Sequence, residues 1–189
     1  MTTKRIYLLL FQTPDMTSTF RIYFTLAVTY LIWTLLLWNH FHGGVPSHHI
    51  LANEELPSVS NWWGAILLPL LTWFLLVRIN RRIKIQKEKI SNSTSLRKVI
   101  FGFAGALFFG MLISLFFILD KTDICGYMIL SLVPISLFFP IYRSEYLLGF
   151  VLGMTYTFGA VLPTAIGLIM AGIASLIYIG LRAITSYIK

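Results

Sequence analysis

Six long apolar segments, almost free of charged residues, constrain this chain more than any other feature. A helix needs about 20 residues to cross the hydrocarbon core of a bilayer, and interfacial aromatic or basic residues complete shorter crossings. With 57% hydrophobic and 12% charged residues, the chain has too little polar surface to coat a water-soluble globule. We therefore predict an all-α integral membrane protein, a single-domain bundle of six transmembrane helices. The segments cover residues 21–41, 61–78, 98–119, 124–142, 146–162 and 164–185.

Prolines indicate where the helices break. Proline lacks an N–H and disfavours helix just before it, so we expect the last apolar region to divide at Pro163. Pro134 and Pro140 lie in the fourth segment, and the alternative to a full crossing there is a re-entrant or broken helix. Pro14 and Asp15 interrupt the short apolar run 6–11, which is too short for a signal peptide. We expect residues 1–20 to lie at the membrane interface.

The basic residues predict the orientation of the bundle. Eight lysines and arginines lie in 78–98, the connection between the second and third segments, and such basic loops remain in the cytoplasm. Alternating from there places both termini and 14 of the 15 basic residues inside. This pattern is typical of the cell inner membrane of bacterial type. The bilayer, with its anionic headgroups, then accounts for the net charge of +8, and no nucleic-acid partner is needed.

Small residues spaced four apart predict which helices pack closely, because close approach matters more than burial between helices in lipid. The third, fifth and sixth segments carry them, so we expect these helices to form a tight core, or else an interface for a membrane protein partner or a second copy of the chain. The residues are Gly102, Ala106 and Gly110; Gly149 and Gly153; and Gly167, Ala171 and Ser175.

Ionisable residues are absent from the middle of every segment, which argues against a proton-driven pump or a charged channel filter. Glu145 follows Arg143 by two residues at a cytoplasmic turn, and we interpret the two as a surface ion pair. The single cysteine, Cys125, excludes an intramolecular disulfide and a multi-cysteine metal cage.

All four histidines fall within ten residues, at the start of the predicted outer loop 42–60. Gly43 and Gly44 make a turn there, Ser47 is a suitable N-cap for a short helix, and Pro57 would end that helix. Within it His48 and Glu55 would share one face. Imidazoles and carboxylates from two outer loops would then converge. The candidate ligand or metal residues are His40, His42, His48, His49, Glu54, Glu55, Asp120 and Asp123.

This constellation has three interpretations. Three imidazoles and a carboxylate suit a divalent metal such as zinc, or acid–base catalysis, although no HExxH or other established zinc spacing is present. Alternatively, the histidines are interfacial anchors. In the third interpretation they close an apolar pocket lined by Trp38, Trp62 and Trp63.

The sequence leaves three functions open and identifies no substrate. The preferred hypothesis is a small membrane component that binds or transports a small molecule or lipid and needs a partner for energy input. In number of helices and in length alone, such a chain is similar to the substrate-binding subunits of vitamin-uptake transporters, and no residue is carried across. The alternatives are a metal-dependent or His/Glu acid–base enzyme acting on a lipid-type substrate at the outer face, and a structural subunit of a membrane complex.

Overall fold

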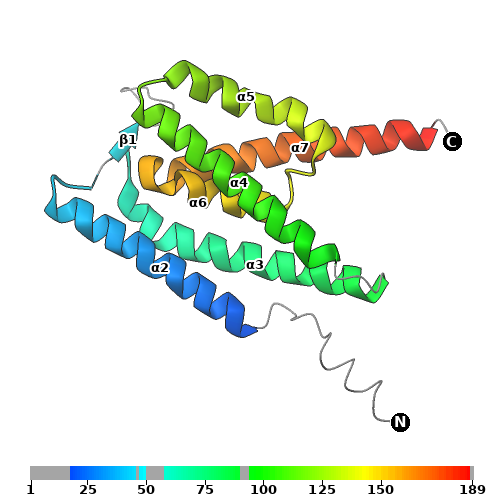
Figure 1. Cartoon of the computed structure of the whole chain (residues 1–189), viewed down its shortest axis with the longest axis horizontal. Helices are drawn as coiled ribbons and strands as arrows, with labels where there is room; N and C mark the ends of the chain where they lie inside the picture. Colours follow the sequence, from blue (N-terminus) through cyan, green and yellow to red (C-terminus); the bar gives the residue numbers. More distant parts are fainter. Residues whose placement is uncertain (1–17, 46, 50–57, 90–93, 188–189) are drawn as a thin grey trace, which may run out of the picture.

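The structure is a computed structural model that describes residues 18–45, 47–49, 58–89 and 94–187. Six α-helices make up nearly all of this part of the chain (Figure 1). A single turn of 3₁₀ helix, η2 (Asn61–Trp63), leads into the second of them. The helices are α2 (Ser18–Phe41), α3 (Gly64–Lys89), α4 (Thr94–Ile118), α5 (Thr122–Phe138), α6 (Ser144–Phe158) and α7 (Val161–Tyr187).

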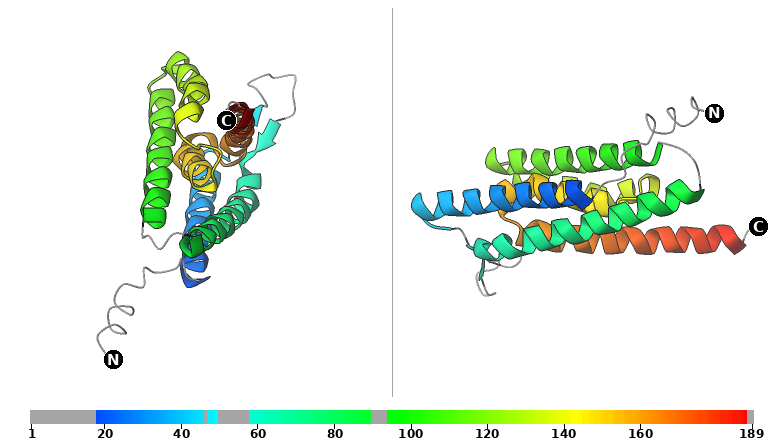
Figure 2. Two further views of the ribbon diagram at one scale, coloured as in Figure 1. Left: turned by 90° about the vertical axis from the view of Figure 1, so that its right-hand side faces the viewer. Right: turned by 90° about the horizontal axis from the view of Figure 1, so that it is seen from below.

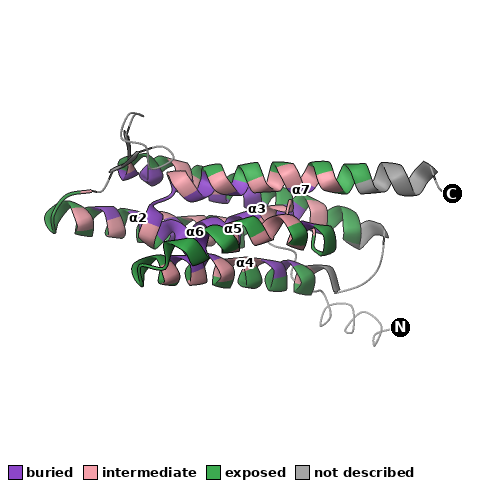
Figure 3. Cartoon of the chain, turned by 90° about the horizontal axis from the view of Figure 1, so that it is seen from above, coloured by how far each residue is buried: buried purple, intermediate pink, exposed green. Residues whose placement is uncertain are grey.

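Four of these helices, α2, α3, α4 and α7, are long and apolar enough to cross a membrane. At 1.5 Å per residue, their 24 to 27 residues correspond to roughly 36–40 Å, more than the ~30 Å of a hydrocarbon core. Large apolar side chains lie exposed along them, as expected of surfaces that contact lipid (Figure 3). The described residues therefore have the helix lengths and the surface of a membrane protein. With 17 and 15 residues, α5 and α6 are shorter.

Successive helices run in alternating directions, so their ends gather at two ends of the bundle (Figures 1 and 2). One end holds the C-terminus of α3 and the N-terminus of α4, and we call it the basic end. The opposite end holds two short strands, and we call it the ribbon end. The fourth helix of the bundle, α5, is continuous through Pro134 and ends at Phe138, before Pro140. It is therefore not broken at Pro134, while the choice between a full crossing and a re-entrant helix stays a prediction.

The ribbon consists of β1 (Ser47–His49) and β2 (Ser58–Ser60), paired antiparallel with Ser47 opposite Ser60. The predicted helix beginning at Ser47 is therefore wrong, because this segment is extended. An isolated helix of about ten residues is marginal, whereas α2 and α3 lie antiparallel and bring the two ends of their connection together, so the backbone groups pair across it.

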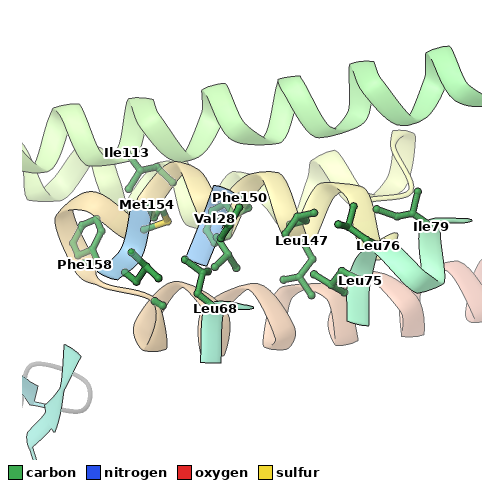
Figure 4. Close-up of a cluster of buried hydrophobic side chains, with 14 of the residues drawn as sticks. Val28, Leu68, Leu75, Leu76, Ile79, Ile113, Leu147, Phe150, Met154 and Phe158 are labelled. Atoms are coloured by element: carbon green, nitrogen blue, oxygen red, sulfur yellow. The ribbon is translucent and has the colours of Figure 1, made fainter. Parts of the chain in front are cut away.

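The short helix α6 lies at the centre of the bundle, where Figure 3 shows most of it as buried. Ten of its 15 residues are buried. Side chains from α2, α3 and α4 converge on it, among them Val28, Leu68 and Ile113 (Figure 4). The core of the molecule therefore surrounds α6.

Glycines bring α4 and α6 into backbone contact, as the small-residue spacing predicted. A Cβ at Gly149 would meet the carbonyl of Phe103, and one at Gly110 would lie 2.7 Å from the carbonyl of Phe150. The hydroxyl of Ser114 donates to the Gly153 carbonyl at 3.3 Å, which adds a polar tie between the same helices. On α7, a Cβ at Gly167 would lie 2.5 Å from Leu147.

The break between α6 and α7 falls at Gly159, not at Pro163. Gly159 has φ +70° and ψ −172°, a conformation open to glycine, and its amide donates to the Thr155 carbonyl. Pro163 is the third residue of α7, in the first turn, where a missing N–H costs no helical hydrogen bond. The predicted break at Pro163 was wrong, because proline is disfavoured inside a helix but is common in its first turn.

Candidate functional site

Two of the predicted histidines, His40 and His42, lie at the C-terminal end of α2 and pack on aromatic rings. His42 stacks on Trp38 with ring centroids 4.0 Å apart, and its Nδ1 lies 2.9 Å from the Trp38 carbonyl oxygen. The ring of His40 lies edge-on to Trp62 at 6.0 Å. Both histidines are exposed. Such contacts with aromatic rings at the end of an apolar helix are those expected of side chains at a membrane interface.

The other predicted site residues lie on other elements or outside the described residues. His48 and His49 belong to β1, opposite Val59 and Ser58. Glu54 and Glu55 lie outside the described residues. Asp120 and Asp123 are exposed at the turn between α4 and α5: Asp120 has φ +59°, and Asp123 occupies the first turn of α5, where a negative charge is favourable.

The described part of the chain contains no group of three or more His, Cys, Asp or Glu side chains that would hold a metal ion. The helix that was to align His48 with Glu55 does not form at β1. A zinc or acid–base site therefore stays a prediction that rests on residues beyond those described.

An elongated apolar groove of about 900 Å³ lies between α2 and α4. Nine of its fifteen lining residues come from α2, from Phe24 to Asn39 at the spacing of one helix face. Phe103 and Leu107 of α4 form the other wall, and α6 and α3 contribute the floor. The fifteen residue-to-residue steps along α2 from Phe24 to Asn39 rise by roughly 22 Å, so the groove extends over more than half the thickness of a ~30 Å hydrocarbon core.

The lining of the groove offers little to a polar ligand. None of its fifteen residues is charged. The hydroxyl of Thr34 donates to the Tyr30 carbonyl at 2.8 Å, and that of Thr155 donates to the Val151 carbonyl at 2.7 Å, so both are satisfied within their own helices. The remaining polar groups of the lining are Asn39 and the indole of Trp38 towards the ribbon end, and the hydroxyl of Tyr156 on α6. The groove therefore suits an apolar chain with a polar group at one end.

Of the three predicted pocket tryptophans, Trp38 lines this groove, whereas Trp62 and Trp63 are not among its lining residues. A second, smaller cavity of about 190 Å³ lies on another side of α6, between α4, α5 and α7. Small residues such as Gly105 and Gly167 leave this space, and its lining is likewise uncharged.

A buried ion pair joins α3 to α6 near the basic end. Arg82 donates to both oxygens of Glu145, from Nη1 at 2.9 Å to Oε2 and from Nη2 at 2.7 Å to Oε1. Glu145 is 1% exposed, and the Arg82 side chain is 26% exposed. Such a two-bond fork fixes both the separation and the rotation of the two helices.

The surface pair predicted between Glu145 and Arg143 is therefore wrong. Arg143 is the extended N-cap of α6, while Glu145 lies in the first turn on the buried side of that helix. Its stem packs on α4 at Gly102, where a Cβ would lie 3.2 Å from the Glu145 Cγ. The sequence carries a signal for this pair. Glu145 is a single acidic residue at the start of an apolar helix, where it needs a partner, and Arg82 lies near the end of another apolar helix.

No protein-family model matches this chain, and neither the curated proteins nor the solved structures contain a significant match to it.

Proposed function

We propose that this chain is a six-span membrane protein that binds an amphiphilic molecule with a single apolar chain, as the binding component of a transport or lipid-handling system. The groove between α2 and α4 is the observation that carries the proposal. Its volume falls within the ~300–1,000 Å³ of ordinary ligand pockets. Its uncharged lining favours an acyl or isoprenoid chain, and Trp38 and Asn39 suit a polar head at one end.

The position of the groove supports entry from the bilayer. Leu31 and Trp38 of α2 line the groove and are also exposed, so the groove opens to the surface of the bundle. A chain already dissolved in lipid would reach the groove sideways without crossing water. Since lipid is as apolar as the groove, selectivity would come from fit and from the polar head, not from the hydrophobic effect.

The orientation completes the proposal: both termini and the basic end face the cytoplasm, and the ribbon end faces outward. The alternating directions of α2 to α7 support six crossings, and the arginines and lysines of 78–98 support the side. In a Cys125→Ser background, a membrane-impermeant maleimide added to intact cells should label Lys121→Cys and spare Lys84→Cys. Labelling in the reverse order would refute this orientation.

Filling the groove tests the binding proposal. Ala27 lines the groove, and Ala27→Trp places a large ring inside it. Ala104 is exposed on α4 and lines neither cavity, so Ala104→Trp makes the same change elsewhere. Native mass spectrometry of the purified chain should find a copurifying amphiphile in the unmodified protein and in Ala104→Trp, and none in Ala27→Trp. Equal retention in all three would refute the groove as the binding site.

A further inference from the structure

The groove between α2 and α4 is closed towards the basic end by two phenylalanines that meet across it. Phe24 of α2 and Phe103 of α4 have ring centroids 6.1 Å apart, with planes 78° from parallel. Both rings line the groove. Because they come from its two opposite walls, they form an end stop.

The aromatic stop is supported on both sides. Behind Phe24, one turn towards the N-terminus, the ring of Phe20 lies 5.8 Å away. On the other wall, the Phe103 carbonyl faces Gly149, where α4 and α6 are in backbone contact. Phe103 therefore extends from the most tightly packed part of the bundle, and its wall has little freedom to move aside.

At the other end, the groove reaches Trp38 and Asn39, where His40 and His42 finish the helix. A ligand whose head lies at Asn39 has an apolar path of roughly 22 Å before its chain meets Phe24, from the helical rise between the two residues. A longer chain has to bend out of the groove. A shorter one leaves lining side chains without contacts.

We infer that Phe24 and Phe103 determine the length of the apolar chain that the groove accepts. This inference rests on the proposed function and assigns the preference for chain length to two named side chains. Truncating either ring lengthens the groove and shifts the preference to longer chains. Enlarging Phe24 to tryptophan shortens the groove and shifts the preference to shorter ones.

The probe is an equal mixture of saturated lysophosphatidylcholines that differ by two carbons, added to the detergent-solubilised full chain. Native mass spectrometry reads the bound fraction of each member, so effects common to the series cancel. Because detergent is as apolar as the groove, the quantity to read is which member of the series has the largest bound fraction, and each stop variant should move it by at least one member. The matched control is Phe108→Ala, which removes an exposed ring from α4 outside the groove.

The expected result is a preferred length in the unmodified protein and in Phe108→Ala, a longer one in Phe24→Ala and Phe103→Ala, and a shorter one in Phe24→Trp. Opposite shifts from one position do not arise from a loosened fold, so the pair of Phe24 variants separates a length stop from simple destabilisation. An unchanged preference in the Phe24 and Phe103 variants that still bind would overturn the length stop alone. Failure of every lysolipid to bind the unmodified protein, or binding unaffected by Ala27→Trp, would overturn the groove and the stop together.

Discussion

Removing the charge of Glu145 tests how much the fold depends on the buried ion pair. Glu145 is 1% exposed and accepts both hydrogen bonds from Arg82. Glu145→Gln removes its charge and keeps the size of its side chain. Breaking one partner of a buried pair costs about 3–5 kcal/mol, because the other charge stays behind. Since 26% of the Arg82 side chain is exposed, water solvates part of that charge, and we expect the lower value, about 3 kcal/mol.

A loss of 1 kcal/mol lowers the melting temperature of a chain of this size by about 2–4 °C, so the expected shift is roughly 6–12 °C. Thermal unfolding in detergent, followed by tryptophan fluorescence, measures it. Asp123→Asn is the control, because it removes the same charge from an exposed carboxylate. A second variant, Arg82→Met with Glu145→Leu, removes both charges and should recover most of the loss. If Glu145→Gln melts no lower than Asp123→Asn, the pair does not stabilise the packing of α3 on α6.

Three further changes test other features of the fold and site. Gly153→Val should cost about 1–3 kcal/mol in thermal unfolding by forcing α4 from α6, whereas Gly172→Val, at a position with open space around it, should cost far less; equal effects would refute the close contact. Gly159→Ala should cost about 1–3 kcal/mol, since its backbone conformation is open to glycine and a Cβ there would meet Asn61; an unchanged melting temperature would contradict that strain. The metal-site hypothesis predicts near-stoichiometric zinc in the purified protein by mass spectrometry and its loss when His42, His48 and His49 are all changed to alanine; zinc equally low in both proteins would refute it.

The parts of the fold that sequence reasoning predicted depend on local patterns. The apolar segments become helices because a charge-free run of this length satisfies its backbone only within itself in lipid. The approach of α4 and α6 follows from Gly110, Gly149 and Gly153, since spacing by four places small residues on one helix face.

The parts that the sequence did not predict depend on contacts between distant residues. Glu145 and Arg82 lie 63 positions apart, and only the packing of α6 inside the bundle decides which arginine it meets. The pairing of β1 with β2 depends on α2 and α3 lying side by side. The groove between α2 and α4 is likewise a property of the assembled helices, because each wall separately is an ordinary apolar face.

The burial of α6 has a consequence for how this protein is made. Ten of the 15 residues of α6 are buried, and one of them is Glu145. The side chains of α6 therefore contact other helices of the chain more than they contact lipid. While α6 emerges from the ribosome, α3 and α4 have already been synthesised, and they offer the arginine and the glycine face that it requires. Synthesis from the N-terminus therefore lets α6 insert beside helices that are already present. A circular permutation that put α6 first would leave the Glu145 carboxylate without a partner during insertion.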